Sequence, residues 1–111
     1  MKTFLKSESN PLEDLGHGIK RQLLGYDSDL TLVRVHFEKG AVGEVHTHLH
    51  QQATYVEKGQ FEVEVEGVKE ILSAGDSFWV SGEMEHGVVA LEEGILIDAF
   101  SPAREDMRPS Q

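Results

Sequence analysis

Three histidines fall within five residues of this chain, at positions 46, 48 and 50, and a glutamine follows at position 52. Residues two apart in an extended strand point to the same face, so His46 and His48 are placed to share one ion. Neutral imidazole is the commonest protein ligand for zinc, nickel, iron and copper. The pair therefore supplies half of a metal site, and His50 and Gln52 have the same parity if the strand stays regular.

A further imidazole has to come from another part of the chain, and His86, at the start of an apolar run, is the best placed candidate. An isolated His-x-His pair also occurs on surfaces and in cores that bind no metal, so the spacing alone leaves both readings open. Helical zinc chemistry is disfavoured, because the segment lacks the glutamate of a His-Glu-x-x-His motif and is flanked by Gly43 and Val45. His17 and His36 have no sequence partner and receive no role.

Composition limits the classes of function that the chain can have. A length of 111 residues fits one domain spanning residues 1–111. The absence of cysteine excludes disulfides, thiolate metal sites and cysteine nucleophiles. Ten basic residues against 20 acidic ones give a net charge of -10, which disfavours binding to nucleic acid or to anionic membranes. No apolar run approaches a spanning helix, so we expect a cytoplasmic protein with neither nucleic acid nor membrane as a partner.

Short β-type segments separated by glycines predict an all-β sandwich or barrel. Alternation is clearest in residues 61–66, where apolar residues and glutamates take opposite faces. The expected strands are residues 31–37, 61–66, 77–80, 88–90 and 95–100. The last strand should end at Ser101-Pro102, because proline cannot donate to a ladder. Helix should be minor and near the termini.

Two spaced groups of residues along the chain resemble the two motifs of the cupin superfamily. The first group is Gly40, His46, His48, Gln52 and Gly59, and the second is Gly75, Ser81-Gly82-Glu83 and His86. The resemblance implies a single-domain cupin with a small double-stranded β-helix, or jelly-roll, barrel whose core spans about residues 30–101. It also implies one divalent metal ion per chain, held by His46, His48, Gln52 and His86. Imidazole and amide ligands leave nickel, zinc, iron and manganese open.

The chain departs from the cupin pattern at several positions. Ser81, Glu83 and Ala90 stand where proline, glycine and asparagine are usual, which bears on the turn rather than on the ligand His86. Gln52 stands where most metallo-cupins have glutamate. Three imidazoles and an amide would leave the full dipositive charge on the ion, which favours a Lewis-acid centre that attracts anionic ligands.

The C-terminal part of the chain narrows the resemblance to the pectin-degradation cupins of the KdgF family. The segments that resemble this family are residues 18–21, 52–57, 92–97 and 98–107. Members of the family open the ring of 4,5-unsaturated uronate monosaccharides from pectin or alginate and give linear 4-deoxy-5-keto uronates. The resemblance therefore implies a metal-dependent enzyme with a small anionic sugar acid as its substrate.

Ring opening of such a cyclic hemiacetal needs a base at the anomeric hydroxyl, a cation near the developing enolate and a group that orients the carboxylate. Asp98 is the candidate base, because a carboxylate on the apolar strand 95–100 is unfavourable unless it lines a cavity or has a partner. Its alternative role is a structural pair with Arg104 or a cap on the turn at Ser101-Pro102.

Arg104 and Phe100 are the two candidate substrate-binding residues. Arg104 suits a carboxylate clamp, because guanidinium recognises carboxylates through two parallel hydrogen bonds. Its alternative is a solvated pair with Glu105 or Asp106. Phe100 is expected to pack against the sugar, and ordinary core packing is its alternative.

Two other classes of function share the expected fold. One is a non-catalytic cupin that binds a small acid, and the other is an iron-dependent cupin dioxygenase, which would consume oxygen. We also expect a homodimer. The N-terminal strands are favoured as its interface over the acidic face formed by Glu62, Glu64 and Glu66.

Overall fold

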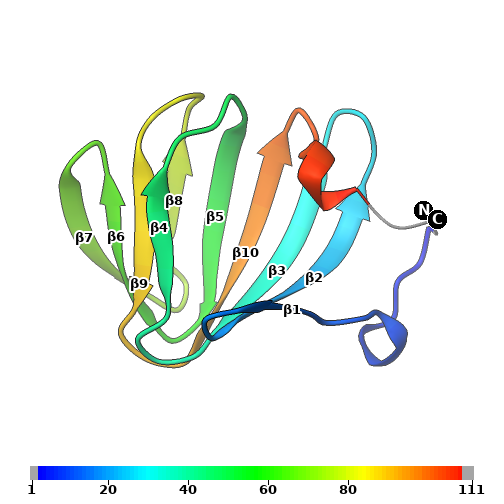
Figure 1. The fold of residues 1–111 in the computed structure, drawn as a ribbon, viewed down its shortest axis with the longest axis horizontal. Helices are drawn as coiled ribbons and strands as arrows, with labels where there is room; N and C mark the ends of the chain where they lie inside the picture. Colours follow the sequence, from blue (N-terminus) through cyan, green and yellow to red (C-terminus); the bar gives the residue numbers. More distant parts are fainter. Residues whose placement is uncertain (1–2, 109–111) are drawn as a thin grey trace.

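The computed structural model describes residues 3–108, which form ten β-strands and two short 3-10 turns (Figure 1). The strands are β1 (Glu13–Gly16), β2 (Ile19–Tyr26), β3 (Thr31–Phe37), β4 (Val42–His46), β5 (Gln51–Lys58), β6 (Gln60–Val65), β7 (Val68–Ser73), β8 (Ser77–Val80), β9 (His86–Ala90) and β10 (Gly94–Ser101). The 3-10 turns are η1 (Ser7–Ser9) and η2 (Glu105–Met107). This architecture confirms the all-β prediction.

Two antiparallel sheets enclose the core. The larger sheet has the order β1-β2-β3-β10-β5-β8, and the smaller has the order β4-β9-β6-β7. Both sheets contribute to one buried cluster, and the rings of Phe37 on β3 and Phe61 on β6 meet edge to face across it with centroids 5.2 Å apart. The larger sheet extends beyond the barrel core expected at residues 30–101, because β1 and β2 pair with each other and β2 pairs with β3.

Strict alternation explains why the central strands lie where they do. On β3, Val33, Val35 and Phe37 are buried, and the residues between them are half-buried on the other face. On β6, Phe61 and Val63 are buried while the intervening glutamates stay in contact with solvent. A one-residue slip would reverse both faces, so burial fixes the register of these strands.

The strands expected at residues 77–80, 88–90 and 95–100 are present as β8, β9 and β10, and β10 ends at Ser101 as proline requires. Helix is confined to the two 3-10 turns near the ends of the described chain. Within residues 3–108, no helix is both long and apolar enough to cross a membrane.

The condition on which the parity of the histidine cluster depended, a regular strand, is not met. β4 ends at His46, and the next residues connect the smaller sheet to β5 in the larger sheet. Because the chain has to cross between sheets here, His48 lies in a loop and the parity argument does not extend from His46 to Gln52. A different geometry brings these side chains together.

Candidate metal centre

Two of the candidate ligands lie side by side on neighbouring strands of the smaller sheet. His46, the last residue of β4, pairs in register with His86, the first residue of β9, and the centroids of their rings are 4.5 Å apart. The loop after β4 then brings in His48, whose ring centroid lies 5.4 Å from that of His46 and 4.8 Å from that of His86. One nitrogen from each ring lies within 4.8 Å of the others, so the three imidazoles are close enough to hold one ion.

Backbone carbonyls set the orientation of two of these rings. Nδ1 of His46 lies 2.7 Å from the carbonyl oxygen of Glu44, and Nδ1 of His86 lies 2.8 Å from that of Met84. A carbonyl can only accept, so each Nδ1 carries the proton and each Nε2 keeps its lone pair. Nε2 of His86 is buried and has no hydrogen-bond partner. A buried, unpartnered acceptor of this kind fits a metal ion.

Burial also keeps two of the imidazoles neutral. It lowers the pKa of His48 and that of His86, in both cases as the largest cause, because a low-dielectric environment disfavours the imidazolium form. His48 is half-buried and His86 is 3% exposed. Neutral rings are the form that binds metal, so the surroundings favour the ligand state of both residues.

Gln52 at the start of β5 joins the histidines to the larger sheet. Its Oε1 accepts a hydrogen bond from Nε2 of His48 at 3.0 Å, and its Nε2 donates to Oγ1 of Thr54 at 2.8 Å. The hydrogen bond to Thr54 fixes the amide so that the oxygen points at the histidine cluster. A separation of 3.0 Å also suits two neighbouring ligands that each lie about 2.1 Å from a shared ion.

Thr54 extends this network to Asp98. Its hydroxyl donates to Oδ1 of Asp98 at 2.6 Å, and Nε2 of Gln52 lies 3.5 Å from the same oxygen. Asp98 is the cross-strand partner of Thr54 on β10, so both side chains lie on the inner face of the larger sheet. Among the described residues no hydrogen bond engages Oδ2, which leaves that oxygen available to a ligand.

Burial raises the pKa of Asp98 to about 6, against the lowering effects of the Thr54 hydrogen bond and the positive charge of Arg104. A carboxylate in this position is a stronger base than one in water, because its charged form has lost solvation. Perturbed carboxyl groups beside a cluster of ligands are typical of functional sites.

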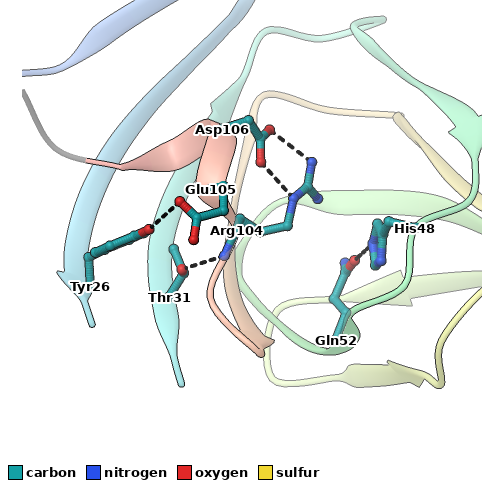
Figure 2. A network of polar contacts seen from close by, with 7 residues as sticks. All are labelled: Tyr26, Thr31, His48, Gln52, Arg104, Glu105 and Asp106. Carbon is teal, nitrogen blue, oxygen red and sulfur yellow. Dashed lines mark hydrogen bonds and ion pairs between the residues drawn. The ribbon is translucent and has the colours of Figure 1, made fainter. Parts of the chain in front are cut away.

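Arg104 reaches toward the site from the segment after β10. Its Nε and Nη2 donate to the two carboxylate oxygens of Asp106, each at 2.9 Å, and its backbone N–H donates to Oγ1 of Thr31 at 2.9 Å. Figure 2 shows the Arg104 guanidinium bound to Asp106, with His48 drawn on the opposite side of the guanidinium from Asp106. The guanidinium carbon lies 5.0 Å from the centroid of the Phe100 ring, and that ring meets His48 with centroids 5.7 Å apart.

The structure thus brings the candidate residues into one site at one end of the barrel. Arg104 pairs with Asp106, which is the alternative role expected for it from the sequence. Asp98 contacts Thr54 and Gln52, and not Arg104, which was the partner in its alternative role. Phe100 is 4% exposed and belongs to the core cluster, so its core alternative is present as well.

Several residues near this site were left without a role by the sequence. Thr54 contacts Asp98 and was not predicted, although it has the same parity as Gln52 along the strand. Asp106, expected only as one alternative partner of Arg104, binds its guanidinium. His50 lies beside His48, with ring centroids 5.4 Å apart, but is not part of the group of three. His36 is half-buried on β3, away from the site.

Comparison with known proteins settles the family. The cupin domain family matches residues 33–98, and the pectin degradation protein KdgF of Dickeya dadantii is 48% identical over 108 residues, which are 96% of this chain and 98% of that protein. The chain belongs to the KdgF family of cupins. The resemblance seen in the sequence is thereby confirmed.

Solved structures extend this result to three dimensions. KdgF from Halomonas sp. has a TM-score of 0.92 and 43% identity, with 97% of this chain and 100% of that one covered. An RmlC-like cupin from Shewanella frigidimarina has a TM-score of 0.95 and 49% identity, with 97% of each chain covered. KdgF cupins therefore share the two-sheet barrel of this chain over nearly its whole length.

Proposed function

We propose that the protein opens the ring of 4,5-unsaturated uronates from pectin or alginate and gives linear 4-deoxy-5-keto uronates. The observation that carries the proposal is the carboxylate of Asp98, held by Thr54 on the inner face of the barrel beside the histidine cluster. The 48% identity to a pectin degradation protein supports the same class of substrate.

The proposed metal ligands are Nε2 of His46, His48 and His86 together with Oε1 of Gln52. Nε2 of His48 now donates to Oε1 of Gln52, so binding of an ion there would replace this hydrogen bond and release its proton. In the neutral rings of His46 and His86 the hydrogen bonds from Nδ1 to backbone carbonyls leave Nε2 as the free nitrogen, and Thr54 keeps the amide oxygen of Gln52 turned toward the histidines. A divalent ion bound there supplies Lewis-acid stabilisation of negative charge on a substrate oxygen, which needs no redox change. Nickel, zinc, iron and manganese all accept this ligand set.

Asp98 is the proposed base. Its Oδ2 accepts the proton of the anomeric hydroxyl, the bond between the anomeric carbon and the ring oxygen breaks, and the ring oxygen leaves as an enolate. The anomeric carbon becomes an aldehyde, and one proton delivered to C4, which balances the one taken up by Asp98, gives the ketone, so the reaction is an isomerisation with no net oxidation or reduction. The raised pKa of Asp98 suits this step, because a base needs enough proton affinity to compete for a hydroxyl proton.

Arg104 is the proposed carboxylate clamp. Asp106 occupies the edge of the guanidinium formed by Nε and Nη2, which leaves the Nη1 edge for a substrate carboxylate. Phe100 lies beneath the guanidinium and against His48, so its buried ring supports the floor between the clamp and the proposed ligands. We propose that the sugar packs there.

Loss of ultraviolet absorbance by a 4,5-unsaturated uronate tests this function. The metal-loaded protein is expected to speed the loss well beyond the spontaneous rate, and chelation should abolish the increase. Saturable binding of the uronate without any turnover would make the protein a non-catalytic small-acid-binding cupin. Oxygen uptake that matches substrate loss would make it an iron-dependent dioxygenase, and either outcome would overturn the proposal.

A further inference from the structure

The proposed carboxylate clamp does not lie on a strand. Arg104 belongs to residues 102–108, which follow β10 and include η2, and we call this segment the C-terminal strap. The ion pair with Asp106 lies within the strap, so it orients the guanidinium without tying it to the barrel. Because β10 fixes only the start of the strap, the place of Arg104 relative to Asp98 depends on other contacts between the strap and the barrel.

A buried hydroxyl attaches the strap to β3. Oγ1 of Thr31, the first residue of β3, accepts a hydrogen bond from the backbone N–H of Arg104 at 2.9 Å (Figure 2). The Thr31 side chain is 0% exposed, and the other buried residues of β3 are all apolar, namely Val33, Val35 and Phe37. A hydroxyl in such a row is unfavourable unless it has a polar partner. The backbone of the clamp residue is that partner.

Two further contacts hold the strap on either side of the clamp. The backbone N–H of Ala103, which is 6% exposed, donates to the carbonyl of Ser28 at 3.4 Å. Met107, in η2, packs against the core cluster, and Figure 1 shows η2 beside the turn that joins β2 to β3. The contact between Tyr26 and Glu105 is exposed and 3.5 Å long, so the buried contacts contribute more to the attachment.

The turn that supports the strap is closed by hydrogen bonds of its own. The N–H of Asp27 donates to the carbonyl of Leu30 at 3.0 Å, and Oδ1 of Asp27 accepts from the N–H of Asp29 at 2.8 Å. An aspartate that binds the backbone two residues on stabilises a turn locally. The end of the β2–β3 hairpin is thus a defined support for the strap, although none of the proposed ligands or the proposed base lies on it.

We propose that Thr31 is a positioning residue for the substrate carboxylate, acting through the backbone of Arg104. This inference rests on the proposed function, which makes Arg104 the clamp. Two parallel hydrogen bonds from a guanidinium to a carboxylate require both a fixed distance and a fixed direction. Within residues 3–108 the hydroxyl of Thr31 forms a hydrogen bond with Arg104 alone. Its loss should therefore weaken substrate binding and leave metal binding and the chemical step in place.

Steady-state kinetics of Thr31→Val and Thr31→Ser on the 4,5-unsaturated uronate test the role of the hydroxyl. Valine has nearly the shape of threonine but accepts no hydrogen bond, so it leaves the buried N–H of Arg104 without a partner. We expect Thr31→Val to raise KM by about tenfold or more and to leave kcat within about twofold. Thr31→Ser keeps the acceptor and should have a KM near that of the wild type. Calorimetric titration should give all three proteins the same metal affinity.

Two more variants separate anchoring of the strap from loss of stability. Met107→Ala shortens the other anchor without touching the hydroxyl of Thr31, and it should raise KM in the same direction. Val35→Ala removes buried volume from the same strand, four residues from Thr31, and should lower the thermal unfolding midpoint with no change in KM. A rise in KM for Val35→Ala equal to that for Thr31→Val would overturn the inference.

Failure of this inference differs from failure of the proposed function. Turnover by the wild type with an unchanged KM in Thr31→Val, or with a fall in kcat alone, overturns the role of Thr31 and leaves the function intact. A wild type without turnover contradicts the function instead. Calorimetric binding of the same uronate then decides the role of Thr31: a Kd raised about tenfold in Thr31→Val supports it, and an equal Kd overturns it.

Discussion

The pKa of Asp98 is set by two opposing effects, its burial and a hydrogen bond from the hydroxyl of Thr54. Burial raises the pKa of the carboxyl to about 6, and the 2.6 Å hydrogen bond from Thr54 is the largest effect in the other direction. The same hydroxyl accepts the hydrogen bond that orients Gln52. Thr54 is therefore a positioning residue for both the proposed base and a proposed ligand.

Replacement of Thr54 by valine should change the pH dependence of the reaction. The hydrogen bond from Thr54 lowers the pKa of Asp98, so its loss raises that pKa further. A base acts only when deprotonated, and activity is lost as the pH falls through its pKa. The acid limb of the rate profile should therefore move to higher pH in Thr54→Val and stay in place in Thr54→Ser. An acid limb that does not move in Thr54→Val would show that this hydroxyl does not tune the base.

Asp106 fixes one edge of the Arg104 guanidinium, and Asp106→Asn should weaken that hold. Two effects oppose each other: the loss of a negative charge favours an anionic substrate, while the freed side chain becomes harder to order. The effect of removing the charge of Asp106 is limited to about 0–1 kcal/mol, the value of an exposed ion pair. Ordering a free arginine side chain costs about 2 kcal/mol of rotamer entropy, so the loss of order should outweigh the gain from the lost charge. We expect KM to rise by about three- to tenfold and kcat to change little.

Glu105→Gln is the matched control for that measurement. Glu105 is adjacent in sequence and exposed, and its carboxylate accepts a long hydrogen bond from the hydroxyl of Tyr26 rather than from the guanidinium. Its KM should equal that of the wild type. A KM for Asp106→Asn that is unchanged or lower would show that Asp106 does not position the clamp.

At the scale of elements, the close approach of β9 to β4 positions the histidine pair. A Cβ atom at Gly87 would lie 2.9 Å from the backbone oxygen of Gly43 and 2.9 Å from the backbone nitrogen of Val45, and neither atom can rotate away. Gly87 directly follows His86, which pairs with His46. A side chain at position 87 would therefore push apart the two strands that carry these proposed ligands.

Gly87→Ala should accordingly weaken metal binding by about tenfold or more and lower the thermal unfolding midpoint, because misplaced ligands lose affinity. Gly25→Ala is the control, since the nearest atom to its Cβ would be 4.0 Å away. Calorimetric titration of both variants with one divalent metal measures the difference. Equal affinities would mean that the approach of β4 and β9 does not set the ligand spacing.

The sequence predicted strands whose buried positions are apolar and missed others. β5 alternates between exposed and buried residues but was not predicted, because two of its buried residues, Gln52 and Thr54, are polar. The alternation of residues 31–37 and 61–66 is visible because each strand has one face in the core. β7 was not predicted, because it is an edge strand whose first four residues are all exposed.

The candidate site was also predicted only in part. Its residue types were visible in the sequence, but the loop that carries His48 was not, because a crossing between sheets leaves no periodic pattern. The contact of Thr54 with Asp98 spans 44 residues, which neither spacing nor composition reveals, whereas the pair of Arg104 with Asp106, two residues on, was one of the alternatives that the sequence offered.

At the scale of the whole molecule, the proposed ligands connect the two sheets. His46 and His86 belong to the smaller sheet, and Gln52 belongs to the larger one. An ion held by all of them would link the sheets at one end of the barrel. Metal binding should therefore stabilise the entire fold, because the ligands come together only in the folded chain.

Thermal unfolding with and without metal measures that link. Metal at about 100 times its Kd contributes about 2.7 kcal/mol, which for a chain of this length raises the Tm by about 10 °C. Chelation should remove the increase, and His86→Ala should show almost none. His36→Ala, which changes a half-buried histidine away from the site, should respond like the wild type. An equal increase in His86→Ala would exclude His86 as a ligand.

The net charge of -10 makes the molecule as a whole unfavourable for an anionic substrate. Attraction in the proposed site has to be local, and Arg104, with 18% of its side chain exposed, is the cation placed to provide it. The absence of glutamate at position 52 adds to this effect, because an amide leaves the charge of a bound cation uncompensated. The sign of the local charge, rather than that of the surface, thus decides which ligand the site accepts.

The central claim is that this chain catalyses ring opening with Asp98 as the base. The most direct test is a proton NMR time course of 4,5-unsaturated uronate with metal-loaded wild type and with Asp98→Asn at equal bound metal. We expect the wild type to convert the vinylic C4 proton signal into that of the linear 4-deoxy-5-keto product, and Asp98→Asn to be about 100-fold slower or worse. Conversion by the wild type at the spontaneous rate, or full activity in Asp98→Asn, would contradict the claim.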